Sequence, residues 1–179
     1  VVNPGNVLGK IIASLHDESG RVAVEGFYED VLAWDEETRE RIRSLPFSPD
    51  EYRRELEVDA LGGEAGFDVL ERLWIRPTCD VNGILCGYTG EGAKTVLPNK
   101  AMAKVSFRLV PDQTPARVAA LVRAHVAKVA PSGVTIEVVE LHGGRPWRTN
   151  VEGKLVDAAS AALEAAFGTP AVLQGEGGS

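Results

Sequence analysis

Two different periods in the pattern of apolar and polar residues predict the helices and strands of this chain. Apolar residues recur every three or four positions from Val7 to Leu15 and again from Val118 to Val129, which is the spacing of one buried helix face. Asn3 and Thr114 precede these two segments, each followed by a proline, and this combination is typical of the first turn of a helix. Both segments are therefore expected to be amphipathic helices.

Three further helices are indicated by composition and by capping signals. Asp35–Arg43 and Ser48–Leu56 are polar segments, and the second begins with a capping-box pattern. The carboxylates at the start of the first are interpreted as a solvent-exposed helix terminus rather than a catalytic pair, because negative charge is favourable at the positive end of the helix dipole. Val151–Phe167 is rich in alanine and is expected to be a helix as well.

Short apolar or alternating segments predict five strands. These are Arg21–Glu25, Leu73–Ile84, Ala101–Val110, Val134–Leu141 and Pro170–Gln174. In Ala101–Val110 the odd-numbered residues are apolar and the even-numbered residues are mostly polar, and alternate residues of a strand point to opposite faces. One face of this strand is thus expected to lie on the core, and the other to be mostly polar.

The order of these elements predicts an α+β fold. Between the first helix and Leu141 the order is helix, strand, strand, helix, strand, and one more strand before Val1 would complete a β-α-β-β-α-β arrangement. We expect a ferredoxin-like two-layer sandwich, an antiparallel sheet with two helices on one face, whose first strand is missing from this chain. Residues 1–145 form this domain, and residues 146–179, a helix and a strand after a glycine pair, are expected to be a piece of a second α/β domain.

Charge and composition argue against several classes of partner. The formal net charge is −7, 44% of the residues are hydrophobic, and no run of basic residues with interleaved aromatics occurs. Nucleic-acid and membrane partners are therefore not expected. The two cysteines, Cys79 and Cys86, lie in an apolar segment and are expected to be buried or half-buried free thiols, which favours a cytoplasmic location.

The histidines do not indicate a metal site. His16, His125 and His142 are far apart in the chain, and none has a second ligand at the spacing typical of zinc sites. No spaced set of His, Asp and Glu ligands occurs elsewhere either. We therefore expect this chain to bind no metal ion by itself.

Three motifs carry a resemblance to a known family. Arg76–Ile84, Gly87–Pro98 and Lys104–Pro111 resemble the lid of bacterial dipeptidases related to cytosolic carnosinase, in the superfamily that includes aminoacylase and carboxypeptidase G. The resemblance runs in order from Asn3 to Ser179. Agreement of several separate motifs makes it more specific than a single glycine pattern.

The resemblance implies a zinc metallopeptidase whose chemistry lies mostly outside this chain. In that family a catalytic domain holds two zinc ions, and the lid forms a homodimer with its twin and closes over a dipeptide or acylated amino acid. This chain would be the lid and dimerisation domain, inactive when isolated. The alternative left open by the sequence is a free-standing ferredoxin-like module that binds a small molecule or a protein and has no catalytic role.

The same resemblance assigns substrate-binding residues but no catalytic residue. Arg108, on the polar face of its strand, matches an arginine that binds the substrate carboxylate, and a guanidinium can do so with two parallel hydrogen bonds. Thr95 matches a position that polarises the scissile amide oxygen or binds substrate from the partner lid. Gly177, Gly178 and Ser179 match a loop whose amides and hydroxyl face that carboxylate, and Gly175 stands where many relatives have Arg.

Overall fold

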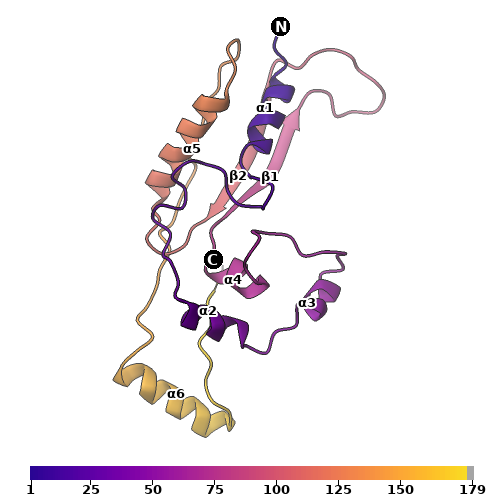
Figure 1. Cartoon of the computed structure of the whole chain (residues 1–179). Helices are drawn as coiled ribbons and strands as arrows, with labels where there is room; N and C mark the ends of the chain where they lie inside the picture. The colour runs from indigo at the N-terminus through magenta and orange to yellow at the C-terminus, as the bar shows by residue number, and fades with distance from the viewer. Residues whose placement is uncertain (177–179) are drawn as a thin grey trace.

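A two-stranded antiparallel sheet with helices on one face forms the centre of the structure, a computed structural model that describes residues 1–176 (Figure 1). Strands β1 (Thr78–Cys86) and β2 (Ala101–Arg108) pair along their length. The helices are α1 (Pro4–Ala13), α2 (Glu36–Arg43), α3 (Pro49–Glu55), α4 (Val69–Trp74), α5 (Pro115–Val129) and α6 (Lys154–Phe167). Helix α1 contacts both strands and α5, so the two amphipathic helices cover the same face of the sheet.

Helices α1 and α5 begin where their capping signals predict. The Asn3 side chain accepts a hydrogen bond of 2.9 Å from the Gly5 amide, and the Thr114 hydroxyl accepts one of 3.4 Å from the Arg117 amide. These bonds satisfy amides that have no partner within the first turn of a helix. Both predicted amphipathic helices are confirmed.

A β-bulge in β1 decides which side chains face the helices. The register with β2 shifts between Val81 and Gly83, so one extra residue is inserted into β1. Because of this insertion, Cys79 before the bulge and Cys86 after it both point to the helix side, although they are seven positions apart. The Cys86 sulfur lies beneath α1, where a Cβ atom on Gly5 would come within 2.7 Å of it.

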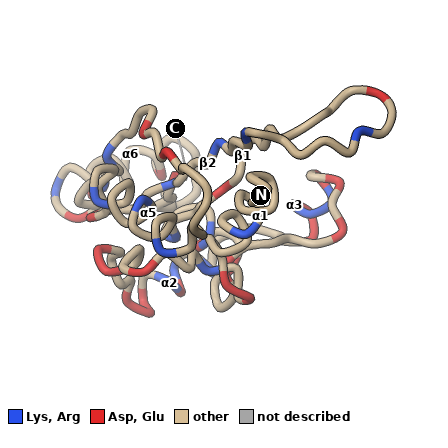
Figure 2. Tube along the Cα trace, turned by 90° about the horizontal axis from the view of Figure 1, so that it is seen from above, with Lys and Arg blue, Asp and Glu red and all other residues tan. Residues whose placement is uncertain are grey.

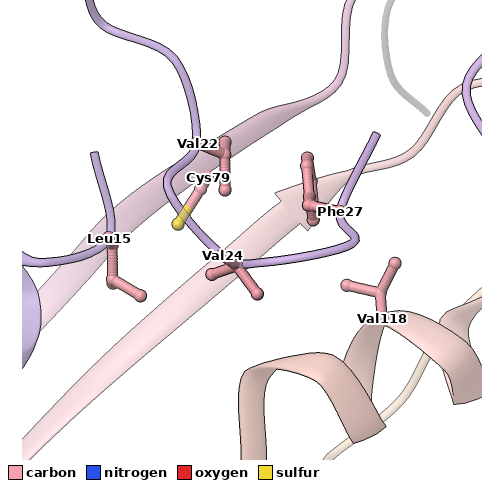
Figure 3. Packing of buried hydrophobic residues seen from close by; sticks show 6 residues of the cluster. All are labelled: Leu15, Val22, Val24, Phe27, Cys79 and Val118. Carbon is pink, nitrogen blue, oxygen red and sulfur yellow. The ribbon is translucent and has the colours of Figure 1, made fainter. Parts of the chain in front are cut away.

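Two apolar clusters fill the space between the sheet and these helices. The first joins the chain after α1 to β1 and α5, and Figure 3 shows its side chains converging: Leu15, Val22, Val24, Phe27, Cys79 and Val118. The second lies between α1, α5 and the segment after α5, and consists of Val7, Ile11 and Val126 with Val134 and Val138 packed against them. Each cluster removes apolar surface from water, and this stabilises the fold by about 25 cal/mol for each Å² of apolar surface that is buried.

A third cluster holds together residues 34–75, here called the insertion, which contain α2, α3 and α4 and lead into β1. Its buried members are Ile42, Leu70 and Ile75, and Trp34 and Trp74 pack against them. Helices α2 and α3 confirm the two polar helices predicted from sequence, with Asp35 and Ser48 as their capping residues. Helix α6 confirms the alanine-rich helix, but none of its residues is buried, and it lies apart from the sheet (Figure 1).

Several predicted strands differ from the structure. Leu73 lies in α4 rather than in a strand, because Asp68 and Glu71 form a capping box that starts a helix there, and β1 begins only at Thr78. Arg21–Glu25 makes one isolated bridge, between His16 and Val22, although its alternation of buried and exposed residues is as predicted. Within the described residues, Val134–Leu141 makes no backbone hydrogen bond to another segment, so it is not a strand.

Pro170–Gln174 likewise forms no strand, for the same reason: a strand requires a partner for its backbone groups. Within residues 1–176 the sheet thus has two strands, and the α+β class is confirmed while the full ferredoxin-like sheet is not formed. None of the helices described is both long enough and apolar enough to cross a membrane.

Candidate functional site

The candidate carboxylate-binding residue, Arg108, ends β2 on the face of the sheet that the helices leave uncovered. Its side chain is exposed, and its register partner in β1 is Thr78. Among the residues described, no carboxylate lies within ion-pair distance of the guanidinium. The five N–H donors of Arg108 are therefore available to a ligand, and their planar arrangement suits a carboxylate.

Polar side chains surround Arg108 on this outer face. Ser106 and Lys104 precede it at alternate positions of β2, and both are exposed. Asp80, the register partner of Ser106, accepts a hydrogen bond of 2.7 Å from the Thr78 hydroxyl. The alternation predicted for β2 is confirmed, since its odd-numbered residues are partly buried and its even-numbered residues are exposed.

Thr95 lies far from Arg108 in the same chain. It is exposed in the irregular loop Gly87–Lys100, which joins β1 to β2 and projects from the body of the molecule (Figures 1 and 2). Arg108 is at the opposite end of β2, seven residues from Ala101, a separation of about 24 Å at the usual rise per residue. The structure does not bring Thr95 and Arg108 together around one small ligand.

The segment before the predicted glycine loop lies at the Arg108 end of the sheet (Figure 1). Gly177, Gly178 and Ser179 are outside the described residues. Gly175 packs directly against Trp74, so close that a Cβ atom on Gly175 would lie 2.6 Å from the Trp74 Cβ. Trp74 ends α4, four residues before the Thr78 that pairs with Arg108.

A buried carboxylate, Glu64, joins the insertion to the start of β1. It is 8% exposed, and both of its oxygens accept hydrogen bonds of 2.8 Å from Arg76. Arg21 approaches one of these oxygens at 3.2 Å. The centre of the Tyr28 ring lies 3.8 Å from the guanidinium carbon of Arg21 and 4.9 Å from that of Arg76, so both cations contact one aromatic ring.

A second buried carboxylate, Glu71, joins α4 to α2. It is 1% exposed, and it accepts hydrogen bonds from Arg39 Nε at 2.6 Å, from Arg43 Nη2 at 3.4 Å and from the Asp68 amide at 2.7 Å. Burial disfavours the ionised Glu71, but the bonds from Arg39 and Asp68 outweigh it and lower the pKa of Glu71 below its ordinary value.

Sequence reasoning missed both buried carboxylates. The spacing of Asp68 and Glu71 is a capping-box signal that could have located the second. No local signal marks the first, because its partners Arg76 and Arg21 are 12 and 43 residues away in the sequence.

Side chains of the types that bind metal ions do not gather in the described part of the chain. Residues 1–176 contain no group of three or more His, Cys, Asp and Glu close enough to coordinate one ion. His125 Nε2 is 2.9 Å from the Ser14 hydroxyl in a structural contact. Cys79 is buried, and burial raises the pKa of its thiol to about 12, so it is not a thiolate ligand. These residues do not fit the two-zinc centre that the resemblance implies.

Comparison with known proteins assigns the family. Residues 1–134 match the family model described as the peptidase dimerisation domain of M20. The chain is 30% identical over 168 residues to the Beta-Ala-His dipeptidase of Rattus norvegicus, covering 92% of this chain and 34% of that protein. It is 27% identical over 184 residues to the Cys-Gly metallodipeptidase DUG1 of Saccharomyces cerevisiae, covering 100% and 38%.

Solved structures agree with this assignment. The M20 family metallo-carboxypeptidase Sso-CP2 from Sulfolobus solfataricus superposes with a TM-score of 0.87 and 38% identity, covering 100% of this chain and 46% of that one. Human carnosine dipeptidase 1 gives a TM-score of 0.83 and 28% identity, with 100% and 39% covered. The chain thus spans between a third and a half of these relatives. It belongs to the M20 family of metallopeptidases and contains the dimerisation domain of that family.

Proposed function

We propose that this chain is the dimerisation and substrate-closing lid of a zinc-dependent dipeptidase, and that it does not hydrolyse peptides alone. The observation that carries the proposal is the match of residues 1–134 to a peptidase dimerisation domain, together with relatives that are named as dipeptidases. The same match favours a lid over a free-standing binding module.

In this proposal Arg108 binds the C-terminal carboxylate of a dipeptide or an acylated amino acid. Its exposure and its lack of an ion-pair partner among the described residues support this role. The separation of about 24 Å along β2 favours Thr95 acting on substrate held by the partner lid of a homodimer rather than on the ligand of Arg108. Gly177, Gly178 and Ser179 would contribute amides and a hydroxyl to the same carboxylate.

The finer architecture is also part of the proposal. One more antiparallel strand between β2 and Val134–Leu141 would complete a ferredoxin-like sandwich and provide hydrogen-bond partners for both. Residues 146–179 would return to the catalytic domain, because α6 exposes apolar side chains that need a cover: Leu155, Leu163 and Phe167. The free thiols of Cys79 and Cys86 favour a reducing, cytoplasmic location. Two zinc ions would be held by the complete enzyme and none by this chain.

Replacing Arg108 with Ala in the complete enzyme tests the proposed role. Loss of a charge-assisted bidentate contact should reduce kcat/KM by about 2–4 kcal/mol, and Arg108→Lys should restore little, because an ammonium lacks the planar pair of donors. The free energy of unfolding should change by no more than about 0.5 kcal/mol, as for most substitutions at exposed positions. Lys104→Ala, on the same strand face, is the matched control. Equal hydrolysis by the Arg108 and Lys104 variants would reject the substrate role.

A further inference from the structure

Two extended segments connect α6 to the rest of the molecule, residues 142–153 before it and residues 169–176 after it (Figure 1). Each of them lies against one tryptophan of the insertion. The first contacts Trp34 and the second contacts Trp74, and both tryptophans pack against the third apolar cluster.

The contact at Trp34 combines stacking with charge attraction. The Arg148 guanidinium lies 4.6 Å from the centre of the Trp34 ring, within the range of a cation–π interaction. The adjacent Asp35 is near enough to respond to the same charge: hydrogen bonds from Thr38, and then the charges of Arg41 and Arg148, lower the pKa of the Asp35 carboxyl. Arg148 is therefore attracted both to the ring and to the carboxylate beside it.

The indole nitrogen of Trp34 gives a second observation at this place. Its Nε1 is buried, and no acceptor for its N–H lies among the described residues. A buried donor without an acceptor is costly, by roughly 1–3 kcal/mol, so such groups are rare in native structures.

The contact at Trp74 depends on glycine at position 175. A Cβ atom there would lie 2.6 Å from the Trp74 Cβ and 2.8 Å from its Cγ, closer than side-chain atoms approach one another. Any larger residue would displace the segment from the indole. The backbone of Gly175 therefore lies directly against the Trp74 side chain.

Both tryptophans are held by one rigid base. Ile42, Leu70 and Ile75 join α2 to α4, and Glu71 binds the arginines of α2 from α4. Because packing and buried hydrogen bonds restrain the same two helices, Trp34 and Trp74 keep a fixed separation. Two segments attached to this base are fixed relative to each other and to the lid.

We propose that Trp34 and Trp74 form a clamp that holds residues 146–176 against the lid, and so favours the closed arrangement in which substrate binds. This inference rests on the proposed function, because a lid that closes must be stabilised in its closed position. The tryptophans act as positioning residues through Arg148 and Gly175, without contact to substrate. When only a fraction of molecules is competent to bind, the apparent dissociation constant rises as that fraction falls.

The test uses Trp34→Ala and Trp74→Ala in the complete protein, with Trp147→Ala as the matched control, because Trp147 is 82% exposed. Hydrogen exchange of a peptide covering residues 146–153 should become about two- to fivefold faster in Trp34→Ala, the equivalent of one lost cation–π contact, and exchange of residues 170–176 should become faster in Trp74→Ala. KM for a dipeptide should rise by a similar factor while kcat stays within about twofold, since saturating substrate restores closure. Destabilisation alone would lower kcat by loss of folded enzyme and leave KM unchanged.

A rescue experiment separates the contact from general damage. Gly175→Ala should reproduce the Trp74→Ala effects, whereas Gly144→Ala, where an added Cβ meets open space, should not. The double variant of Trp74 and Gly175 should show exchange no faster than Trp74→Ala, because without the indole the added Cβ has nothing to clash with and the two changes are coupled.

Unchanged exchange in the tryptophan variants, an equal effect of Trp147→Ala, or additive effects in the double variant would overturn the clamp. Faster exchange with unchanged KM would overturn its role in closure. Absence of dipeptide hydrolysis by the complete enzyme without substitutions would instead reject the proposed function, and the exchange results would still decide whether the clamp exists.

Discussion

Replacing Glu71 with Gln changes the charge at the centre of the insertion while keeping the size of the side chain. In the structure the carboxylate, 1% exposed, accepts hydrogen bonds from two arginines and one backbone amide. Glutamine can accept at one oxygen only, and its amide N–H groups would face the guanidinium groups of Arg39 and Arg43. The substitution therefore removes the charge attraction and leaves donors opposed to donors.

The expected loss follows from how buried each partner is. Removing one member of a fully buried ion pair costs about 3–5 kcal/mol. Arg39 and Arg43 are 23% and 27% exposed, so water partly compensates them when the carboxylate is gone. We expect Glu71→Gln to lower the free energy of unfolding by about 2–3 kcal/mol at pH 7, which for a protein of this size lowers Tm by roughly 4–12 °C.

The pH dependence gives a sharper test than the magnitude. Because the folded-state pKa of Glu71 is lowered, its stabilising contribution is complete above the unfolded-state value of about 4.3 and is lost as pH falls through the lower folded-state value. The difference between the parent protein and Glu71→Gln should therefore be largest at neutral pH and shrink below about pH 4.

Urea unfolding at pH 7 and at pH 3 measures both effects. Glu18→Gln is the control, because Glu18 is exposed and has no ion-pair partner among the described residues. A Glu71→Gln difference below about 0.5 kcal/mol at pH 7, which is the ordinary range for surface positions, would refute the reasoning. So would a difference of equal size at both pH values.

Three further outcomes are expected. Iodoacetamide at pH 8 should modify Cys86 and spare Cys79, whose thiol is buried and has a pKa raised by burial to about 12; equal labelling by mass spectrometry would contradict that burial. Sedimentation should detect self-association at tens of micromolar, a concentration suited to weak interfaces, because the hairpin exposes Ile84 and Leu85; monomer alone would count against it. Metal analysis after dialysis should find no stoichiometric zinc, and one or two tightly held ions per chain would require ligands within it.

Most of the helices were predictable from this sequence because their signals are local, whereas α4, with a capping box that is just as local, was taken for a strand. An N-cap side chain bonds to an amide two or three residues ahead, so Asn3, Asp35, Ser48 and Thr114 mark helix starts without reference to the rest of the fold. The polar face of β2 was predictable for the same kind of reason, since alternation alone places Arg108 opposite the core. The exposed position of Arg108 agrees with that prediction.

The residues that hold the insertion could not be found in this way. Glu64 binds Arg21 and Glu71 binds Arg39, pairs separated by 43 and 32 positions, and no period in the sequence relates them. The location of Thr95 was equally beyond prediction, because the direction in which the loop Gly87–Lys100 leaves the hairpin depends on tertiary packing. Apart from Gly83, no residue in the sequence of β1 indicates the bulge.

The segment Val134–Leu141 shows why the strand predictions differed from the structure. Val134 and Val138 pack against the second apolar cluster, beside α1 and α5, which is where the last strand of a ferredoxin-like sandwich would lie. What the segment lacks is a neighbour: β2 pairs with β1 on one edge only, and Val134–Leu141 pairs with nothing in the part of the chain described. A strand is defined by its partner, whereas its sequence pattern is defined by its burial, so the pattern can be correct where the strand is not formed.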